Sequence, residues 1–190
     1  MFYGSRNSVA LLILAVLWSI PSYGLLSTEI EPIIGYEREQ KLVPTPHTKD
    51  RMVYGARAIV GFLILGAEAE YLRGQDTEDF PTLSFSTKDT SDKLKLGIRS
   101  TFRMGGLFAL YLRAGGQATQ SVHEETASGV TTVETKPLVY RPYAGVGLRA
   151  KLTKRVSVVG DITAVFSEYF PNGMDRNEYQ TSLGFSVKFP

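Results

Sequence analysis

The 190-residue sequence contains no cysteine, which excludes a disulfide framework and a lipid-modified N-terminal cysteine. It has only two histidines and one tryptophan. The 21 Lys and Arg residues nearly balance the 19 Asp and Glu residues, so the chain lacks the basic excess typical of nucleic-acid-binding proteins. Its longest uninterrupted apolar stretch near the N-terminus, residues 9–18, is short of the roughly 20 residues that a spanning helix needs.

This short apolar run is typical of a signal peptide. Arg6 precedes it, and Pro21 and the small-residue sequence Ser22-Tyr23-Gly24 follow it. We expect cleavage after Gly24, so that residues 1–24 are the signal peptide and residues 25–190 are one domain. The alternative, a single N-terminal membrane anchor, is disfavoured by the length of the run.

The rest of the chain alternates between apolar and polar residues with a period of two, which indicates β-strands with two different faces. Short connections near residues 63–64, 104–106 and 153–155 alternate with long polar ones, as in bacterial up-and-down barrels. Residues 58–67 are apolar on both faces; a buried helix is the alternative, and we favour two strand ends around a tight turn. The sequence therefore predicts an all-β, eight-stranded antiparallel transmembrane barrel, with strands over residues 28–39, 52–62, 65–71, 94–103, 108–119, 138–151, 156–167 and 178–189.

Aromatic residues on the apolar face are sorted by height along the predicted barrel. Between them the face is aliphatic, and two aromatic rings around an aliphatic band are expected at the two interfaces of a bilayer. A soluble ligand-carrying barrel has no reason to sort its aromatics in this way. The long-loop ring consists of Tyr36, Tyr54, Tyr71, Tyr140, Phe166 and Tyr179, and the short-turn ring of Phe62, Phe102, Phe108 and Phe189.

The opposite face is then the barrel interior, and it is rich in charge. Buried charges must be paired, and an eight-stranded barrel is just wide enough for side chains to fill it. We therefore expect a plug of ion pairs and hydrogen bonds, with interior glycines making room for long side chains. The predicted interior charges are Glu29, Glu31, Glu37, Arg57, Glu68, Glu70, Lys95, Arg99, Arg103, Arg113, Arg141, Arg149, Asp161, Glu178 and Lys188.

The last strand alternates strictly and ends in an aromatic residue. Its spacing Ser182-x-Gly184-x-x-Val187-x-Phe189 resembles the terminal recognition signal of bacterial outer-membrane β-barrels. The whole mature chain resembles small barrels of the OmpA transmembrane domain, OmpX and OmpW kind. This resemblance implies a place among outer-membrane lipid and lipopolysaccharide, delivery by periplasmic chaperones, and insertion by the barrel-assembly machinery, with Phe189 as the anchor. Pro190 departs from the usual ending at the aromatic.

Residues suited to catalysis are scarce. We expect His47 and His123 to lie exposed in long loops, and neither has the His-x-Ser spacing of the outer-membrane lipid hydrolases. His123-Glu124-Glu125 lacks converging metal ligands. We therefore predict no enzyme, no cofactor and no metal site.

Binding is expected in the loops, because rigid barrels carry their variable residues there. Residues 117–122 and 130–136 alternate around a turn at 127–129, which predicts a hairpin above the membrane. Its edge either accepts a partner strand or is simply solvated. Residues 75–92 are predicted to form a loop. This loop either covers the mouth of the barrel or meets lipopolysaccharide; the alternative is a mobile polar loop with neither role.

The sequence thus predicts a plugged outer-membrane barrel with a structural or adhesive role and an extracellular partner. Three alternatives stay open. One is a narrow channel for small solutes or ions, gated by interior Arg and Glu pairs. The second is a lipid-modifying enzyme, and the third is a soluble ligand-carrying barrel, which the sorting of the aromatics disfavours.

Overall fold

The computed structural model describes residues 26–41, 47–62, 64–80, 85–127, 130–166 and 177–189. Residues 1–24 and Pro190 lie outside these ranges, so the predicted signal peptide stays a prediction. No described residue belongs to a helix long and apolar enough to span a bilayer. The strands are β1 (Leu26–Lys41), β2 (His47–Phe62), β3 (Leu65–Phe80), β4 (Phe85–Met104), β5 (Phe108–Ala127), β6 (Val130–Thr135), β7 (Val139–Lys151), β8 (Val156–Val165) and β9 (Glu178–Phe189).

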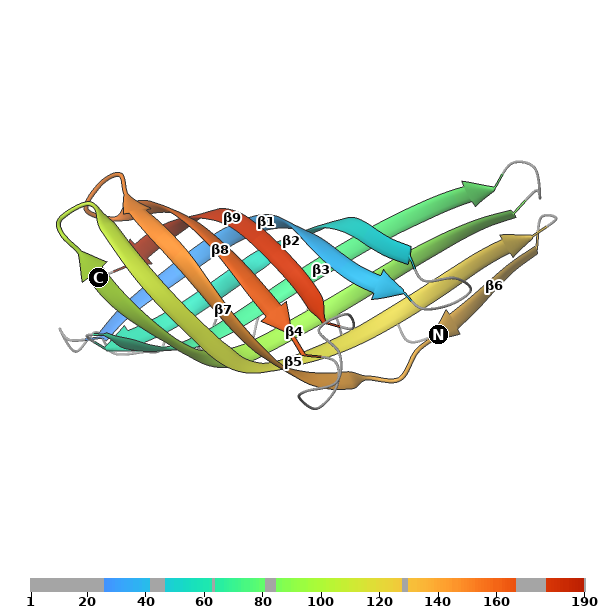
Figure 1. Cartoon of the computed structure of the whole chain (residues 1–190), viewed down its shortest axis with the longest axis horizontal. Helices are drawn as coiled ribbons and strands as arrows, with labels where there is room; N and C mark the ends of the chain where they lie inside the picture. Colours follow the sequence, from blue (N-terminus) through green and yellow to red (C-terminus); the bar gives the residue numbers. More distant parts are fainter. Residues whose placement is uncertain are drawn as a thin grey trace.

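These strands form one closed antiparallel ring (Figure 1). β1 pairs with both β2 and β9, and the pairing of β4 with β5 closes the sheet. β6 and β7 share one position in the ring, because both pair with the same side of β5. β7 pairs with residues 108–119 of β5, and β6 pairs with residues 122–127. The ring therefore has eight strand positions, which confirms the predicted eight-stranded up-and-down barrel.

Tight connections lie at one end of the barrel. Phe62 of β2 pairs with Leu65 of β3, so residues 58–67 are two strand ends around a turn and not a helix. Between β4 and β5, Gly105 takes φ 74°, a left-handed conformation that glycine adopts without steric cost. β9 ends at this same end, where Phe189 pairs with Thr28.

The strands continue far beyond the opposite rim. β3 and β4 remain paired from Gln75–Thr90 up to Phe80–Phe85. The prediction of a loop over residues 75–92 was therefore wrong, because most of this segment is strand. The predicted hairpin of β5 and β6 is confirmed. Residues 75–80, 85–92, 120–127 and 130–135 together form what we call the protruding sheet, seen at the right of Figure 1.

Burial is inverted relative to a soluble protein. On β4, Leu96 and Ile98 are 57% and 63% exposed, while Lys95 and Arg99, which flank them in the sequence, are 0% and 2% exposed. Aliphatic side chains left outside and ionised ones buried inside are what a lipid environment selects. The aromatic residues predicted for the two rings are exposed on this outer face, except Phe166, which is half-buried.

Candidate functional site: the charged barrel interior

The barrel interior holds equal numbers of acidic and basic side chains in ion pairs. Each charged group comes from the inward parity of its strand, and each contacts at least one group of opposite charge. Within the described ranges, the paired carboxylates are Glu29, Glu31, Glu37, Glu68, Glu70, Asp161 and Glu178, and the paired cations are Arg51, Arg57, Lys93, Lys95, Arg99, Arg113 and Arg149.

Arg57 of β2 occupies the centre and is completely buried. Its Nε donates to Glu70 Oε2 at 2.6 Å and its Nη1 to Glu31 Oε2 at 2.9 Å. Nη1 also lies 2.9 Å from Asp161 Oδ2 on β8. One guanidinium thus joins three carboxylates from three different strands.

Arg99 of β4 is the second central cation. It donates to both carboxylate oxygens of Glu31, from Nη1 to Oε1 at 2.9 Å and from Nη2 to Oε2 at 3.0 Å. Its Nε donates to Glu68 at 2.9 Å. The guanidinium also lies over the Tyr111 ring, 4.1 Å from its centroid. The planar fork of arginine suits such bidentate contacts.

Arg113 and Lys95 extend the network toward β5 and the long-loop end. Arg113 Nη2 lies 2.6 Å from Glu68 Oε1 and 2.7 Å from Glu70 Oε2. Lys95 Nζ donates to Glu70 Oε1 at 2.8 Å and also to the side-chain amide oxygen, Oε1, of Gln180 on β9. Glu70 therefore receives hydrogen bonds from three cations.

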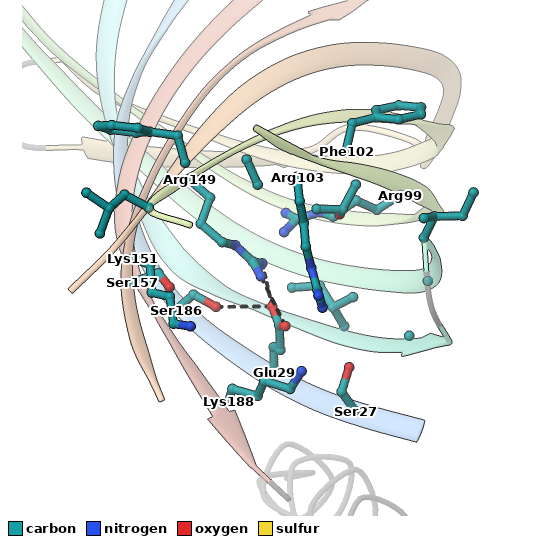
Figure 2. Close-up of a pocket in the computed structure, with 18 of the residues that line it drawn as sticks. Ser27, Glu29, Arg99, Phe102, Arg103, Arg149, Lys151, Ser157, Ser186 and Lys188 are labelled. Atoms are coloured by element: carbon teal, nitrogen blue, oxygen red, sulfur yellow. Dashed lines mark hydrogen bonds and ion pairs between the residues drawn. The ribbon is translucent and has the colours of Figure 1, made fainter. Parts of the chain in front are cut away.

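Smaller clusters extend the network toward both ends. Nearer the long loops, Glu37 pairs with Arg51 and Lys93, and Lys93 also pairs with Glu178. Nearer the short turns, Arg149 pairs with Glu29, which also accepts a hydrogen bond from Ser186 at 3.2 Å (Figure 2).

Two tyrosines fill the space between the ions. Tyr111 donates to Asp161 at 2.9 Å, and Tyr143 donates to Glu68 at 3.3 Å. A Cβ at Gly147 would collide with the Tyr111 ring, and one at Gly97 would collide with the Tyr143 hydroxyl. Glycine at these inward positions therefore leaves room for the tyrosines.

The structure differs from the predicted interior set at its edges. Arg103 and Lys188 are exposed at the short-turn mouth and Arg141 is half-buried; none of the three makes an ion pair with a described residue. Arg51 and Lys93 were missed. Each continues the inward parity of its strand, as in Arg51, Val53, Gly55, Arg57, so extending the alternation by one step would have identified both.

The expectation of an exposed loop was wrong for His123, which lies half-buried in β5. Its Nδ1 lies 2.6 Å from Asp89 Oδ1. His47 begins β2, and its side chain lies outside the described part of the structure. In the described ranges, no three His, Asp or Glu residues are grouped to hold a metal ion.

Comparison with known proteins gives a fold and no family. No family profile matches the chain, and no curated protein matches it. Ail, the attachment invasion locus protein of Yersinia pestis, is similar in structure with TM-score 0.58 and 11% identity, over 86% of this chain and 98% of that chain. Neisserial surface protein A gives 0.56 and 12%, over 86% and 97%. The N-terminal barrel of Pseudomonas aeruginosa OprF gives 0.54 and 16%, over 86% and 97%.

The apolar exterior and this shared fold agree. They define an integral β-barrel of the bacterial outer-membrane type, as the sequence predicts.

Proposed function

We propose that this protein is an outer-membrane barrel sealed by its interior ion pairs, and that its role is structural or adhesive, carried out through the protruding sheet. The observation that supports sealing is that the ion pairs cross the lumen. Lys93 on β4 pairs with Glu178 on β9, and in the ring three strand positions separate β4 from β9 on either side. The partners therefore reach each other across the full diameter.

The free energy of burying charge favours keeping the interior ion pairs intact. Separating a buried pair leaves an uncompensated charge, which costs several kcal/mol. Glu31, Arg57 and Glu70 have no exposed side-chain surface and share partners, so moving one side chain breaks several contacts at once. A pathway for ions through the centre would require all three to move.

Planar-bilayer recording tests the sealed interior against the channel alternative. We expect the wild-type barrel to give no reproducible unitary current. Arg99→Ala removes one central cation and Glu68→Ala one of its carboxylate partners, and either truncation should permit small leak events. Reproducible wild-type unitary currents that change in these variants would support the channel and refute the seal.

The protruding sheet supports the adhesive part of the proposal. β6 is exposed along its whole length, with Val130 and Val133 at 68% and 59% exposure. In the described structure it pairs on one side only, with β5. An extended sheet with a free edge and exposed valines offers a surface to a partner.

The charge of this sheet favours a basic partner. Lys88 is the only Lys or Arg within its residues, against eight acids: Asp76, Glu78, Asp79, Asp89, Asp92, Glu124, Glu125 and Glu134. Ail has been crystallised with the heparin analogue sucrose octasulfate. The acidic surplus here opposes a sulfated ligand, so we propose a cationic partner surface for this chain.

We propose a non-catalytic role. Within the described residues, His123 makes no hydrogen bond to a hydroxyl group that a base would activate. Overexpression should leave the masses of lipid A and phospholipids unchanged. A new lipid species that disappears in His123→Ala would instead support the enzyme alternative.

We further propose that β9 directs assembly, with Ser182, Gly184, Val187 and Phe189 as its recognition residues. β9 closes the ring by pairing with β1, so its placement completes the barrel. Phe189 is 43% exposed on the outer face at the short-turn end, where it is accessible to the barrel-assembly machinery. Periplasmic chaperones would deliver the unfolded chain, and the aromatic rings would meet lipid and lipopolysaccharide headgroups.

A further inference from the structure

A cavity of about 720 Å³ opens at the short-turn end of the barrel (Figure 2). It lies on the short-turn side of the central ion pairs, and Arg149 and Glu29 form part of its lining. Its volume falls within the roughly 300–1,000 Å³ typical of small-molecule sites. In the described structure it is therefore large enough for a small ligand and not only for a few waters.

The lining of this mouth cavity is strongly basic. Arg103, Lys151, Lys154, Arg155 and Lys188 all line it and are all exposed, and none makes an ion pair with a described residue. Glu29 is its one acidic lining residue, and Arg149 and Ser186 already bind that carboxylate. The cations of the mouth cavity therefore have no acidic counterpart within the lining.

This surplus is separate from the interior network. The interior carboxylates and cations balance one another, so the interior does not need the mouth cations for neutrality. The cations come from β4, β7, β9 and the β7–β8 turn, so they surround the cavity from several sides. A concave surface lined by one sign of charge between low-dielectric walls concentrates counter-ions.

We propose that the mouth cavity binds a small anion carrying two or more phosphate groups. Figure 2 shows the Arg103 and Lys188 side chains pointing into the cavity. Arginine forks bind phosphate oxygens bidentately, and lysine adds a compact point charge. Ser27, Thr101 and Ser157 supply neutral hydroxyl donors in the same lining. The cations line a hollow and not a flat face, which favours a small ligand over a macromolecular surface.

Two sources supply such phosphate groups at this end of the barrel. One is a soluble polyphosphate-type anion in the periplasm. The other is the headgroup of an anionic phospholipid that carries two phosphates, such as cardiolipin, from the inner leaflet. The chemistry of recognition is the same, so the experiment must offer both.

Isothermal titration calorimetry on the refolded chain in nonionic detergent tests the proposal. The probes are sodium tripolyphosphate and, separately, a short-chain cardiolipin, whose headgroup carries two phosphates. The test variant is Arg103→Gln/Lys188→Gln, whose residues make no ion pair with described residues, so the barrel should keep its heat-modifiable migration on gels. The matched control, Arg38→Gln/Lys136→Gln, removes two exposed cations from the long-loop end.

We expect saturable binding that weakens with salt, is about tenfold weaker in the test variant, and is unchanged in the control. Binding of tripolyphosphate alone identifies a soluble anion, and binding of the short-chain lipid identifies a headgroup; both outcomes support the site. Absence of binding by either probe, or equal affinities in the wild type and the folded test variant, overturns it.

Discussion

Arg99 on β4 holds both carboxylate oxygens of Glu31 on β1, at 2.9 and 3.0 Å. Two strand positions, β2 and β3, separate these strands in the ring, so the contact spans the lumen and does not follow the wall. Glu31 also binds Arg57, so one carboxylate joins two central guanidinium groups. Substitution of Glu31 therefore disturbs both guanidinium groups at once.

Glu31→Gln should lower the free energy of unfolding by about 3–5 kcal/mol, because it leaves Arg57 and Arg99 buried with one counter-charge fewer. The side chain keeps nearly the same shape, so the loss reports charge and not packing. Urea unfolding of the refolded barrel in lipid vesicles measures it. A loss near zero would show that the interior is wet enough to screen its charges.

Asp50→Asn provides the control for that experiment. Arg38 lowers the pKa of Asp50, mainly through a hydrogen bond, so the pair stabilises the fold above the ordinary aspartate pKa and stops doing so as pH falls through the lowered value. Both side chains are more than half exposed, and solvent screens the pair. We therefore expect no measurable change in unfolding at neutral pH.

Gly115→Ala should destabilise the barrel by about 1–3 kcal/mol, because the added methyl group collides with the Leu96 carbonyl oxygen and the neighbouring strand must move. Gly116→Ala is the matched control: it faces outward, with no atom within 4 Å of the new methyl group. Parallel urea titrations compare the two. Equal effects would contradict the close approach of β4 and β5 at the inner face.

The sequence predicts the two faces of the barrel well, because lipid on one side and ion pairs on the other impose a period of two. That signal disappears in the part of the protruding sheet that β3 and β4 form, which continues beyond the aromatic residues of the long-loop ring. Residues 75–92 therefore look like a polar loop in the sequence, although they are paired strands. The hairpin of β5 and β6 was predicted because its own alternation continues.

Which charges meet inside depends on the whole ring and not on any one strand. The pairing of Lys93 with Glu178 requires β4 and β9 to lie opposite each other at the same height, which depends on strand number and stagger. Arg51 and Lys93 were missed for a local reason: each precedes the first outward apolar residue with which the predicted strand began. Arg103 has the inward parity but lies too close to the mouth for a buried pair.

Replacing residues 122–135 with Asn-Gly tests the role of the protruding sheet. The Lys136 amide donates to the Ser121 carbonyl at 2.8 Å, so the cut ends already lie together and a two-residue turn can join them. We expect the barrel to fold and insert normally, while cells that display it adhere less to a cationic, polylysine-coated surface, because three of the eight acids of the sheet are removed. Unchanged adhesion with normal surface display would refute a binding role for the β5–β6 hairpin.

Phe189→Ala tests the proposed assembly strand. We expect a smaller heat-modifiable fraction in cells but nearly normal stability once the barrel is folded, because the residue lies at the rim. Phe185→Ala removes another exposed aromatic, 56% exposed against 43% for Phe189, from the same face of β9 and should assemble as the wild type does. Equal assembly of both variants would show that the terminal aromatic has no special part in insertion.

The most direct test of the sealed interior is the reactivity of a cysteine at position 182 toward a small, water-soluble thiol reagent. The chain has no native cysteine, and Ser182 is only 8% exposed on the inner face, so Ser182→Cys is nearly isosteric and gives a single probe. In the barrel folded into vesicles, the account predicts that this thiol stays unmodified while Lys136→Cys, beyond the rim, reacts to completion. Rapid modification of the folded Ser182→Cys barrel would reveal a water-filled lumen and contradict the account.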